Sequence, residues 1–381
     1  MIAAFKSWSD RLLGRGEASI TVPVFDGALK SNRLIEDAPV LATLAAPADL
    51  ASDGQGLFVA DGARIWRHDA AATTWAPSEV MHGLAPHGQL ITALACVPGG
   101  GLAVALDGRA VHIVGGRFDG RRFEAANGQP LVAVNAIAAT ADGRLIVTDG
   151  SARQPVERWK HDLMELGRSG RVLEFGLADG SARELAGGLG YAFGACATAD
   201  GTWVCESWRH RVLRVATPVG QATEASPAPR PVLDNLPGYP SRIMPAAGGG
   251  YWLTCFALRT QLVEFVLREP VFRKRMLAEV DPAYWIAPAL NSGNTYLEPM
   301  QGAHLKMMGV VKPWAPPRSY GLVIRLDAAG LIRYSLHSRF DGQHHGVVAA
   351  VECGPFLYLL ALGRKRLLRL AVADVERSLA A

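Results

Sequence analysis

Residues 135–150 read NAIAATADGRLIVTDG: a short apolar run, a polar turn at Gly143, and a second run rich in β-branched residues. This pattern predicts two antiparallel strands joined by a tight turn, since glycine accepts turn backbone angles and β-branched residues favour strands. The pattern occurs six times along the chain. The six copies lie at 48–62, 92–108, 135–150, 194–207, 241–256 and 346–362.

The spacing of the copies predicts the fold. Their turn glycines are Gly54, Gly99, Gly143, Gly201, Gly249 and Gly354, at successive intervals of 45, 44, 58, 48 and 105 residues. A four-stranded β-propeller blade takes about 40–50 residues. We therefore expect an all-β protein, a six-bladed β-propeller, in which the long last interval contains an insertion.

The propeller is expected to span residues 41–372, between an N-terminal extension (1–40) and a C-terminal tail (373–381). The insertion in blade five is placed at about 268–316. Pro270 suits a helix start, and an apolar helical face is then formed by Phe272, Met276, Leu277 and Val280. In the extension, Ile2, Phe5, Trp8 and Leu12 share a helical face that would either dock on the body or touch a membrane surface.

Composition narrows the classes of function. Of the 381 residues, 49% are hydrophobic and 19% charged, with a net charge of +4, which is unlike a disordered chain or a nucleic-acid-binding protein. The five cysteines have no metal-binding spacing and read as buried free thiols. With no secretory signal, they predict a cytoplasmic protein, and no apolar run reaches the length of a transmembrane segment. The expected partner is a small-molecule substrate or ligand; partner proteins are not indicated.

Propellers bind ligands where their inner strands enter the central channel. In register, the residue at each strand mouth should stand eight positions before its turn glycine. This count gives Asn135, Phe193, Ser241 and Gly346, and in the looser first repeat Ala48.

From about Pro47 to Leu370 the sequence resembles the strictosidine synthase-like proteins, relatives of the SMP-30/gluconolactonase and paraoxonase propellers. The resemblance is densest in NAIAATADGRLIVTDGS, SGRVLEF, GLGYAFGACATADGTWVCES and NLPGYPSRI followed by GGGYWL. The closing segments KPWAPPRSYGLVIRLD and SLHSRFDGQHHGV resemble a bacterial branch of that family.

The resemblance implies a divalent cation at the channel mouth, held by a glutamate and several Asn or Asp residues. Carried over by position, Asn135 is retained, whereas the other ligand positions fall on Ala48, Ala136, Phe193 and the pair Ser241-Arg242. Calcium takes about 6–8 oxygen ligands, and an arginine would repel it.

We therefore expect no metal and no other cofactor. The alternative that stays open is a cation such as calcium, held through Asn135 and Asp49, in a metal-dependent gluconolactonase-like hydrolase. The glutamate that the family uses for strictosidine synthesis falls on Val348, and Glu352 lies nearer the turn. Pictet–Spengler strictosidine synthesis is thus not supported.

A polar segment, SLHSRFDGQHHG, precedes the last inner strand. His345 adjoins the predicted mouth position and is the candidate general base, with Asp341 to orient it and His344 beside it. The leading hypothesis is a metal-independent ester or lactone hydrolase whose substrate contacts Arg242, Asn135, Ser241 and Phe193. The alternative is that these histidines decorate a polar loop of a non-catalytic small-molecule-binding or scaffold propeller.

Three further groups are weighed in the same way. Phe193 would form a pocket wall with Tyr191, Tyr239 and Trp252, or all four would pack within blades. The loop residues Arg153, Glu157, His161 and Asp162 would form a lid or a solvated loop. Glu206 is expected to pair with a nearby arginine in a structural turn.

Overall fold

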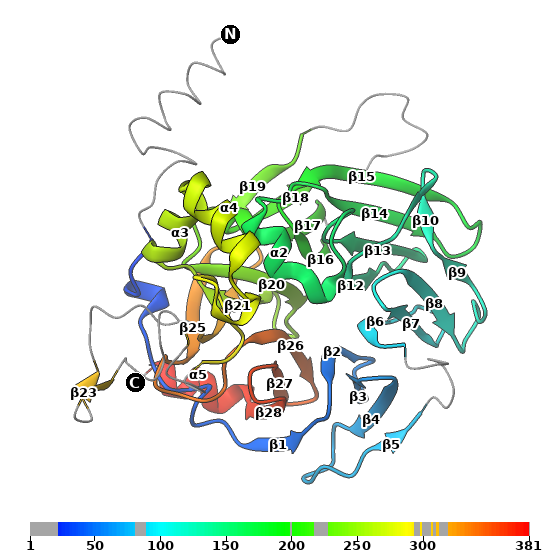
Figure 1. Cartoon of the computed structure of the whole chain (residues 1–381). Helices are drawn as coiled ribbons and strands as arrows, with labels where there is room; N and C mark the ends of the chain where they lie inside the picture. The colour runs from blue at the N-terminus through cyan, green and yellow to red at the C-terminus, as the bar shows by residue number, and fades with distance from the viewer. Residues whose placement is uncertain are drawn as a thin grey trace.

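The computed structural model describes residues 22–80, 89–198, 200–216, 228–292, 298, 306–307, 310–311 and 319–380. Six four-stranded antiparallel sheets surround a common axis (Figure 1). The predicted six-bladed β-propeller is confirmed. The N-terminal residues Ile2, Phe5, Trp8 and Leu12 lie outside the described residues.

Each blade runs from an inner strand outward. Blade one contains β2 (Pro47–Ser52), β3 (Gly56–Asp61), β4 (Arg64–Asp69) and β5 (Ser78–Glu79). Blade two contains β6 (Ile91–Cys96), β7 (Leu102–Leu106), β8 (Ala110–Val114) and β9 (Arg122–Phe123). Blade three contains β12 (Val134–Ala139), β13 (Arg144–Asp149), β14 (Gly170–Gly176) and β15 (Ala182–Leu189).

The second half of the ring follows the same plan. Blade four contains β16 (Ala192–Thr198), β17 (Gly201–Glu206), β18 (Arg211–Val215) and β19 (Arg230–Leu233). Blade five contains β20 (Gly238–Pro245), β21 (Tyr251–Leu258), β24 (Gly321–Leu326) and β25 (Ile332–Ser338). Blade six contains β26 (Val347–Cys353), β27 (Phe356–Ala361), β28 (Arg366–Ala371) and β1 (Val40–Thr43). Two small ribbons lie outside the blades: β10 (Ala125–Ala126) with β11 (Gln129–Pro130), and β22 (Lys306–Met307) with β23 (Val310–Val311).

All six predicted turn glycines have a positive φ, between 58° and 140°. This left-handed backbone region is costly for residues with a Cβ atom, so it explains why glycine recurs at these turns.

The ring closes without a covalent bond. β1 comes from the N-terminal side of the propeller and pairs with β28 near the C-terminus, with Val40 opposite Leu368 and Thr43 opposite Arg366. The sequence analysis did not predict this strand, because it is short and lacks a second copy of the repeat pattern.

Every inner strand carries a β-bulge near its start, where it has one more residue than the neighbouring strand. The bulges lie between Pro47 and Asp49, Ile91 and Ala93, Val134 and Ala136, Ala192 and Ala195, Pro240 and Ile243, and Val347 and Ala349. Bulges turn side chains away from the regular alternation of a strand and are common at barrel rims and active sites. The six bulges therefore form a ring around one channel mouth.

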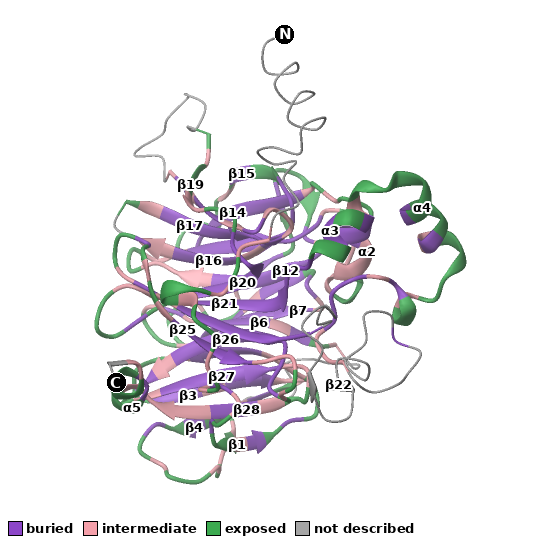
Figure 2. Ribbon diagram, turned by 90° about the vertical axis from the view of Figure 1, so that its left-hand side faces the viewer, coloured by how far each residue is buried: buried purple, intermediate pink, exposed green. Residues whose placement is uncertain are grey.

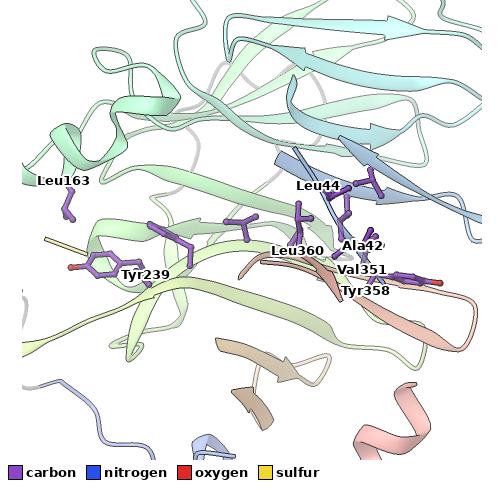
Figure 3. Close-up of a cluster of buried hydrophobic side chains, with 14 of the residues drawn as sticks. Ala42, Leu44, Leu163, Tyr239, Val351, Tyr358 and Leu360 are labelled. Atoms are coloured by element: carbon purple, nitrogen blue, oxygen red, sulfur yellow. The ribbon is translucent and has the colours of Figure 1, made fainter. Parts of the chain in front are cut away.

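The core lies between blades and within them. One apolar cluster joins Leu163 of the helix α2 (Trp159–Met164) and Tyr239 of blade five to Val351, Tyr358 and Leu360 of blade six (Figure 3). These side chains are at most 4% exposed. Burial of this apolar surface at blade contacts supplies the main driving force for closing the ring.

The insertion in blade five runs between β21 and β24, and so begins earlier than the predicted residue 268. It contains α3 (Gln261–Arg268), α4 (Pro270–Glu279) and the 3-10 turn η6 (Pro282–Tyr284). Pro270 begins α4 as predicted, and Met276 is buried. Phe272 is 48% exposed, so the predicted apolar face of this helix is only partly buried. α3 was missed, because its short apolar pattern directly follows a strand.

The other helical segments are η2 (Gly27–Leu29), η4 (Val156–Arg158), α2 (Trp159–Met164), η5 (Ser207–Arg209) and α5 (Val372–Ala380). α2, α3 and α4 lie on one face of the propeller, whereas α5 lies on the opposite face (Figure 2). Lys160 of α2 donates to the Pro282 carbonyl across 3.2 Å, which joins the helices into one cap. No helix among the described residues is long and apolar enough to cross a membrane.

Candidate functional site: a cavity at the channel mouth

A cavity of about 690 Å³ opens at the channel mouth that carries the bulges. Each blade contributes its bulge residue to the lining. These residues are Ala48, Thr92, Asn135, Phe193, Arg242 and Val348. The volume falls within the range of small-molecule sites.

The predicted mouth positions are correct for blades one, three and four. In blade six the mouth residue is Val348, not Gly346. The β26–β27 turn contains only two residues between Cys353 and Phe356, so the strand mouth stands closer to the turn glycine than in blade three. Val348 is also the position where the resemblance implied a catalytic glutamate.

Blade five also differs from the expectation, because its bulge contains both Ser241 and Arg242. Arg242 lines the cavity, whereas the Ser241 hydroxyl is buried against Thr254, 2.7 Å from its Oγ1. Ser241 therefore holds β20 against β21 and does not line the cavity.

Two threonines hold the bulges in place. In blade five, Thr254 Oγ1 accepts from the Arg242 amide at 3.1 Å and donates to the Val348 carbonyl of blade six at 3.0 Å. In blade three, Thr148 Oγ1 accepts from the Ala136 amide at 3.1 Å and donates to the Phe193 carbonyl of blade four at 2.6 Å. Each hydroxyl thus links its own bulge to that of the next blade.

The buried side chain of Arg242 forms the part of the cavity lining that we call the floor. Its Nη2 donates to the Thr92 carbonyl at 3.0 Å and to the Asn135 carbonyl at 2.6 Å, and Nη1 lies 3.4 Å from the Val348 carbonyl. The Phe193 ring covers it, with the guanidinium carbon 5.3 Å from the ring centroid, a cation–π contact.

Asp49 neutralises this arginine. Its Oδ1 lies 3.0 Å from Arg242 Nε, and because the N–H does not point along this vector the contact is an ion pair rather than a hydrogen bond. The Leu50 and Leu94 amides donate to its two oxygens. Burial raises the pKa of Asp49 to about 6, against the lowering effect of Arg242 and the two amides. Its carboxylate is therefore mainly ionised at neutral pH.

Asn135 stands beside the arginine and is 2% exposed. Its Nδ2 donates to the Ala192 carbonyl at 3.1 Å, and its Oδ1 accepts from the Tyr191 hydroxyl at 3.4 Å. Tyr191 stacks on Trp208 with ring centroids 4.4 Å apart. Of the aromatic residues proposed for the pocket wall, Phe193 lines the cavity, while Tyr191, Tyr239 and Trp252 are buried in blade packing.

These residues do not fit a divalent cation. The guanidinium is itself a cation among these oxygens, and its N–H groups already use the carbonyls of Thr92 and Asn135. Within the described residues, no group of three His, Cys, Asp or Glu side chains could hold a metal. Asp49 is paired with Arg242, so it is not a free oxygen ligand for calcium.

The residues predicted to catalyse hydrolysis lie elsewhere. His345 is 2% exposed; its Nε2 donates to the Arg339 carbonyl and its Nδ1 accepts from the Ser319 hydroxyl, both at 2.7 Å. Burial lowers its pKa. Asp341 lies 3.8 Å from Arg339, and does not orient His345 through any of these contacts.

His344 is equally engaged. Its Nδ1 donates to the Ile35 carbonyl and its Nε2 accepts from Arg366, both at 2.8 Å. Neither histidine lines the cavity. His344 joins Ile35 to Arg366 of blade six, and His345 joins Ser319 to Arg339, so both placements favour a structural role. The catalytic role remains a prediction without support from this geometry.

The loop 153–162 contributes one polar cavity residue, Glu157. Asp162 is buried, accepting from Trp208 Nε1 at 2.7 Å and the Ser151 hydroxyl at 2.6 Å, and so fixes α2 to blade four.

Glu206 accepts from Arg211 Nε at 2.6 Å, which confirms the expected structural pair. Glu352 accepts from the Ala247 amide at 2.8 Å, near the other end of the inner strand.

Among the lining residues that the sequence analysis missed, four are polar or charged: Thr92, Asp107, Arg109 and Lys365. Thr92 could have been found by extending the mouth count to blade two, where the turn contains three consecutive glycines. Asp107, Arg109 and Lys365 lie in turns between outer strands, for which the repeat pattern gives no register. A second hollow of about 460 Å³, lined in part by Gly249, Arg325 and Glu376, lies away from the channel mouth.

The fold and cavity define a six-bladed β-propeller with a small-molecule-sized site at one end of its channel. No protein-family profile matches the chain. It is 27% identical over 234 residues to the adipocyte plasma membrane-associated protein of Salmo salar, covering 58% of this chain and 46% of that protein. It is 26% identical over 208 residues to the protein strictosidine synthase-like 6 of Arabidopsis thaliana, covering 54% and 51%. The chain spans about half the length of these curated relatives.

Solved structures agree on the fold. A gluconolactonase of Xanthomonas campestris superimposes with a TM-score of 0.55 at 14% identity, over 92% of this chain and 95% of that one. The calcium-binding protein regucalcin of Agrobacterium tumefaciens gives 0.50 at 12% identity, over 87% and 92%. The chain is thus similar in sequence to a strictosidine synthase-like protein, and it shares its fold with the gluconolactonase and regucalcin propellers. Its assignment to a bacterial branch stays a prediction.

Proposed function

We propose that this protein binds a small, partly apolar organic molecule in the channel-mouth cavity. The observation that carries the proposal is that one bulge residue from every blade lines a single cavity. Val348 and Ala48 form an apolar side on blades six and one. Thr92 and Asn135 supply polar groups on blades two and three.

The floor of the cavity favours an uncharged ligand head. The Arg242 guanidinium is 5% exposed and its N–H groups mostly contact protein oxygens, so it has little capacity left to bind a carboxylate. At Arg242, a neutral group with hydrogen-bond acceptors, such as an ester or lactone, therefore suits the cavity better than an anion does.

Hydrolysis of such an ester or lactone is the second candidate function, and the carboxylates of Glu157 and Asp107 on the cavity wall favour it. A carboxylate would take a proton from water while the water oxygen attacks the carbonyl carbon, and the proton would pass to the departing alkoxide. Glu157 is the better candidate, because Asp107 already accepts from the Leu90 amide at 2.7 Å. This reaction requires no metal ion.

The test is a screen of aryl esters and lactones for turnover and for thermal stabilisation. A ligand of the cavity should raise the Tm of the wild type but not of Phe193→Trp, which fills the cavity. Hydrolysis should fall at least about tenfold in Glu157→Gln and be unchanged in Glu165→Gln, a carboxylate of the same helical segment outside the lining. Binding without turnover would leave the first proposal standing and remove the second. No binding to a broad panel would contradict both.

A cytoplasmic location also stays a prediction. One of the relatives named above, from Salmo salar, is called membrane-associated.

A further inference from the structure

We infer that the guanidinium of Arg242 is the permanent cation of this channel, and that it joins the inner strands of the ring in the place of a bound metal ion. The inference concerns how the channel is held together and does not depend on the proposed ligand.

The contacts of Arg242 reach around the whole ring. The residue belongs to blade five, pairs with Asp49 of blade one, donates to the Thr92 and Asn135 carbonyls of blades two and three, and lies under Phe193 of blade four. Its Nη1 approaches the Val348 carbonyl of blade six. One side chain thus contacts the inner strands of all the other blades.

The oxygens around the guanidinium are of the kinds that bind cations. Three of them are backbone carbonyls and one is a carboxylate, which are the oxygen types that also bind calcium. The planar guanidinium suits this set, because its fork of N–H donors can address several acceptors in different directions. The bulges are essential, since they place these carbonyls at the mouth.

The buried pair should also make the site selective. A buried charge left without its partner is strongly unfavourable. Asp49 and Arg242 therefore stabilise each other in their buried positions. A divalent ion would have to displace a covalently tethered cation from between these groups. We therefore expect the purified protein to bind no stoichiometric metal at the channel mouth.

Chemical rescue tests this inference. Arg242→Ala should lower the Tm by about 4–7 °C, because it leaves the buried Asp49 charge without its partner. Guanidinium ion at low millimolar concentration should restore most of the lost Tm, while sodium chloride at the same ionic strength should not. The wild type should show no such gain.

The matched control is Arg325→Ala. Arg325 is also in blade five, in β24, and donates to the Gly249 carbonyl of a turn at 2.6 Å, but it is partly exposed and does not line the channel-mouth cavity. Arg325→Ala should lower the Tm by less than Arg242→Ala does, and guanidinium ion should not restore the lost Tm. If Arg242→Ala fails to fold, Arg242→Lys keeps the charge with fewer donors and should fold with an intermediate Tm.

Measurements on the wild type complete the test. Metal analysis should find less than one calcium or zinc ion for each chain, and a chelator should leave the Tm unchanged. Stoichiometric metal, a chelator-sensitive Tm, a fully stable Arg242→Ala, or no difference between guanidinium and sodium would each overturn the inference. Loss of ligand binding alone would bear on the proposed function and not on this one.

Discussion

Arg242 Nε of blade five lies 3.0 Å from Asp49 Oδ1 of blade one, although blade six stands between these two blades. The pair therefore spans the channel mouth instead of one blade contact. This pairing explains why an arginine stands at a strand mouth where the family resemblance implied oxygen ligands for a metal. The arginine supplies positive charge at the mouth, and Asp49 balances it.

Substitution of Asp49 should test this pairing directly. Asp49→Asn keeps the shape but leaves the Arg242 charge buried without a counter-ion, so we expect a loss of about 3–5 kcal/mol in the free energy of unfolding. Arg242→Met should cost a similar amount. The double variant should be more stable than the sum of the two losses predicts, as measured by denaturant unfolding. Strict additivity would show that the two side chains do not interact.

The bulge in blade five should depend on the Thr254 hydroxyl. Thr254→Val removes the acceptor for the Arg242 amide and the donor to the Val348 carbonyl, both buried, so we expect a loss of about 1–3 kcal/mol. Thr254→Ser keeps the hydroxyl and should lose less. Equal stability of the two variants, measured by urea unfolding, would contradict the role given to the hydroxyl.

His345 should be a structural residue. His345→Ala removes bonds to Ser319 and the Arg339 carbonyl and should lower the Tm, while binding of a cavity ligand by the folded fraction should be retained. Calorimetric titration at a temperature well below the Tm would measure this. A folded variant that binds ligand but has lost turnover would restore the general-base role predicted from the sequence.

The fold should be sensitive to acid through His337. This residue is fully buried, and burial lowers its pKa to about 4, with Arg339 adding to the effect. The unfolded chain takes up the proton near pH 6.5. The stability from the neutral ring is therefore complete above about pH 6.5 and is lost as the pH falls toward 4, by on the order of 3 kcal/mol.

His337→Gln removes this titration. Urea unfolding between pH 7 and pH 4 should give a flatter stability profile for the variant than for the wild type, even if the variant is less stable at pH 7. Parallel stability profiles of the variant and the wild type would show that His337 has the same pKa in the folded and unfolded states. Its bonds to the Tyr320 and Ser335 hydroxyls, at 3.0 and 2.7 Å, explain why the neutral ring is retained.

The fold could be predicted from the sequence because its repeat is local. A turn glycine between two apolar runs, such as Gly143, marks each blade regardless of what its neighbours do. The closing strand β1 could not be found in this way, since its four residues form a strand only by pairing with the distant β28.

The site could be predicted only in part. Asn135 and Phe193 stand at the expected count, eight residues before Gly143 and Gly201, and both line the cavity. In blade six the turn glycine directly follows the inner strand, so the mouth residue is Val348, and in blade five Arg242 lines the cavity whereas Ser241 does not. His345 was misplaced because nearness in sequence to a strand mouth does not fix the direction of a side chain.

The bulges have a consequence for how such a protein can change over evolution. In each blade, the cavity-lining residue at the bulge stands outside the ladder of backbone pairing. A lineage can therefore exchange one sector's chemistry at a time, with the other sectors as an unaltered frame. The scaffold and the residues that line the site can therefore evolve independently, and similar folds can carry unrelated specificities.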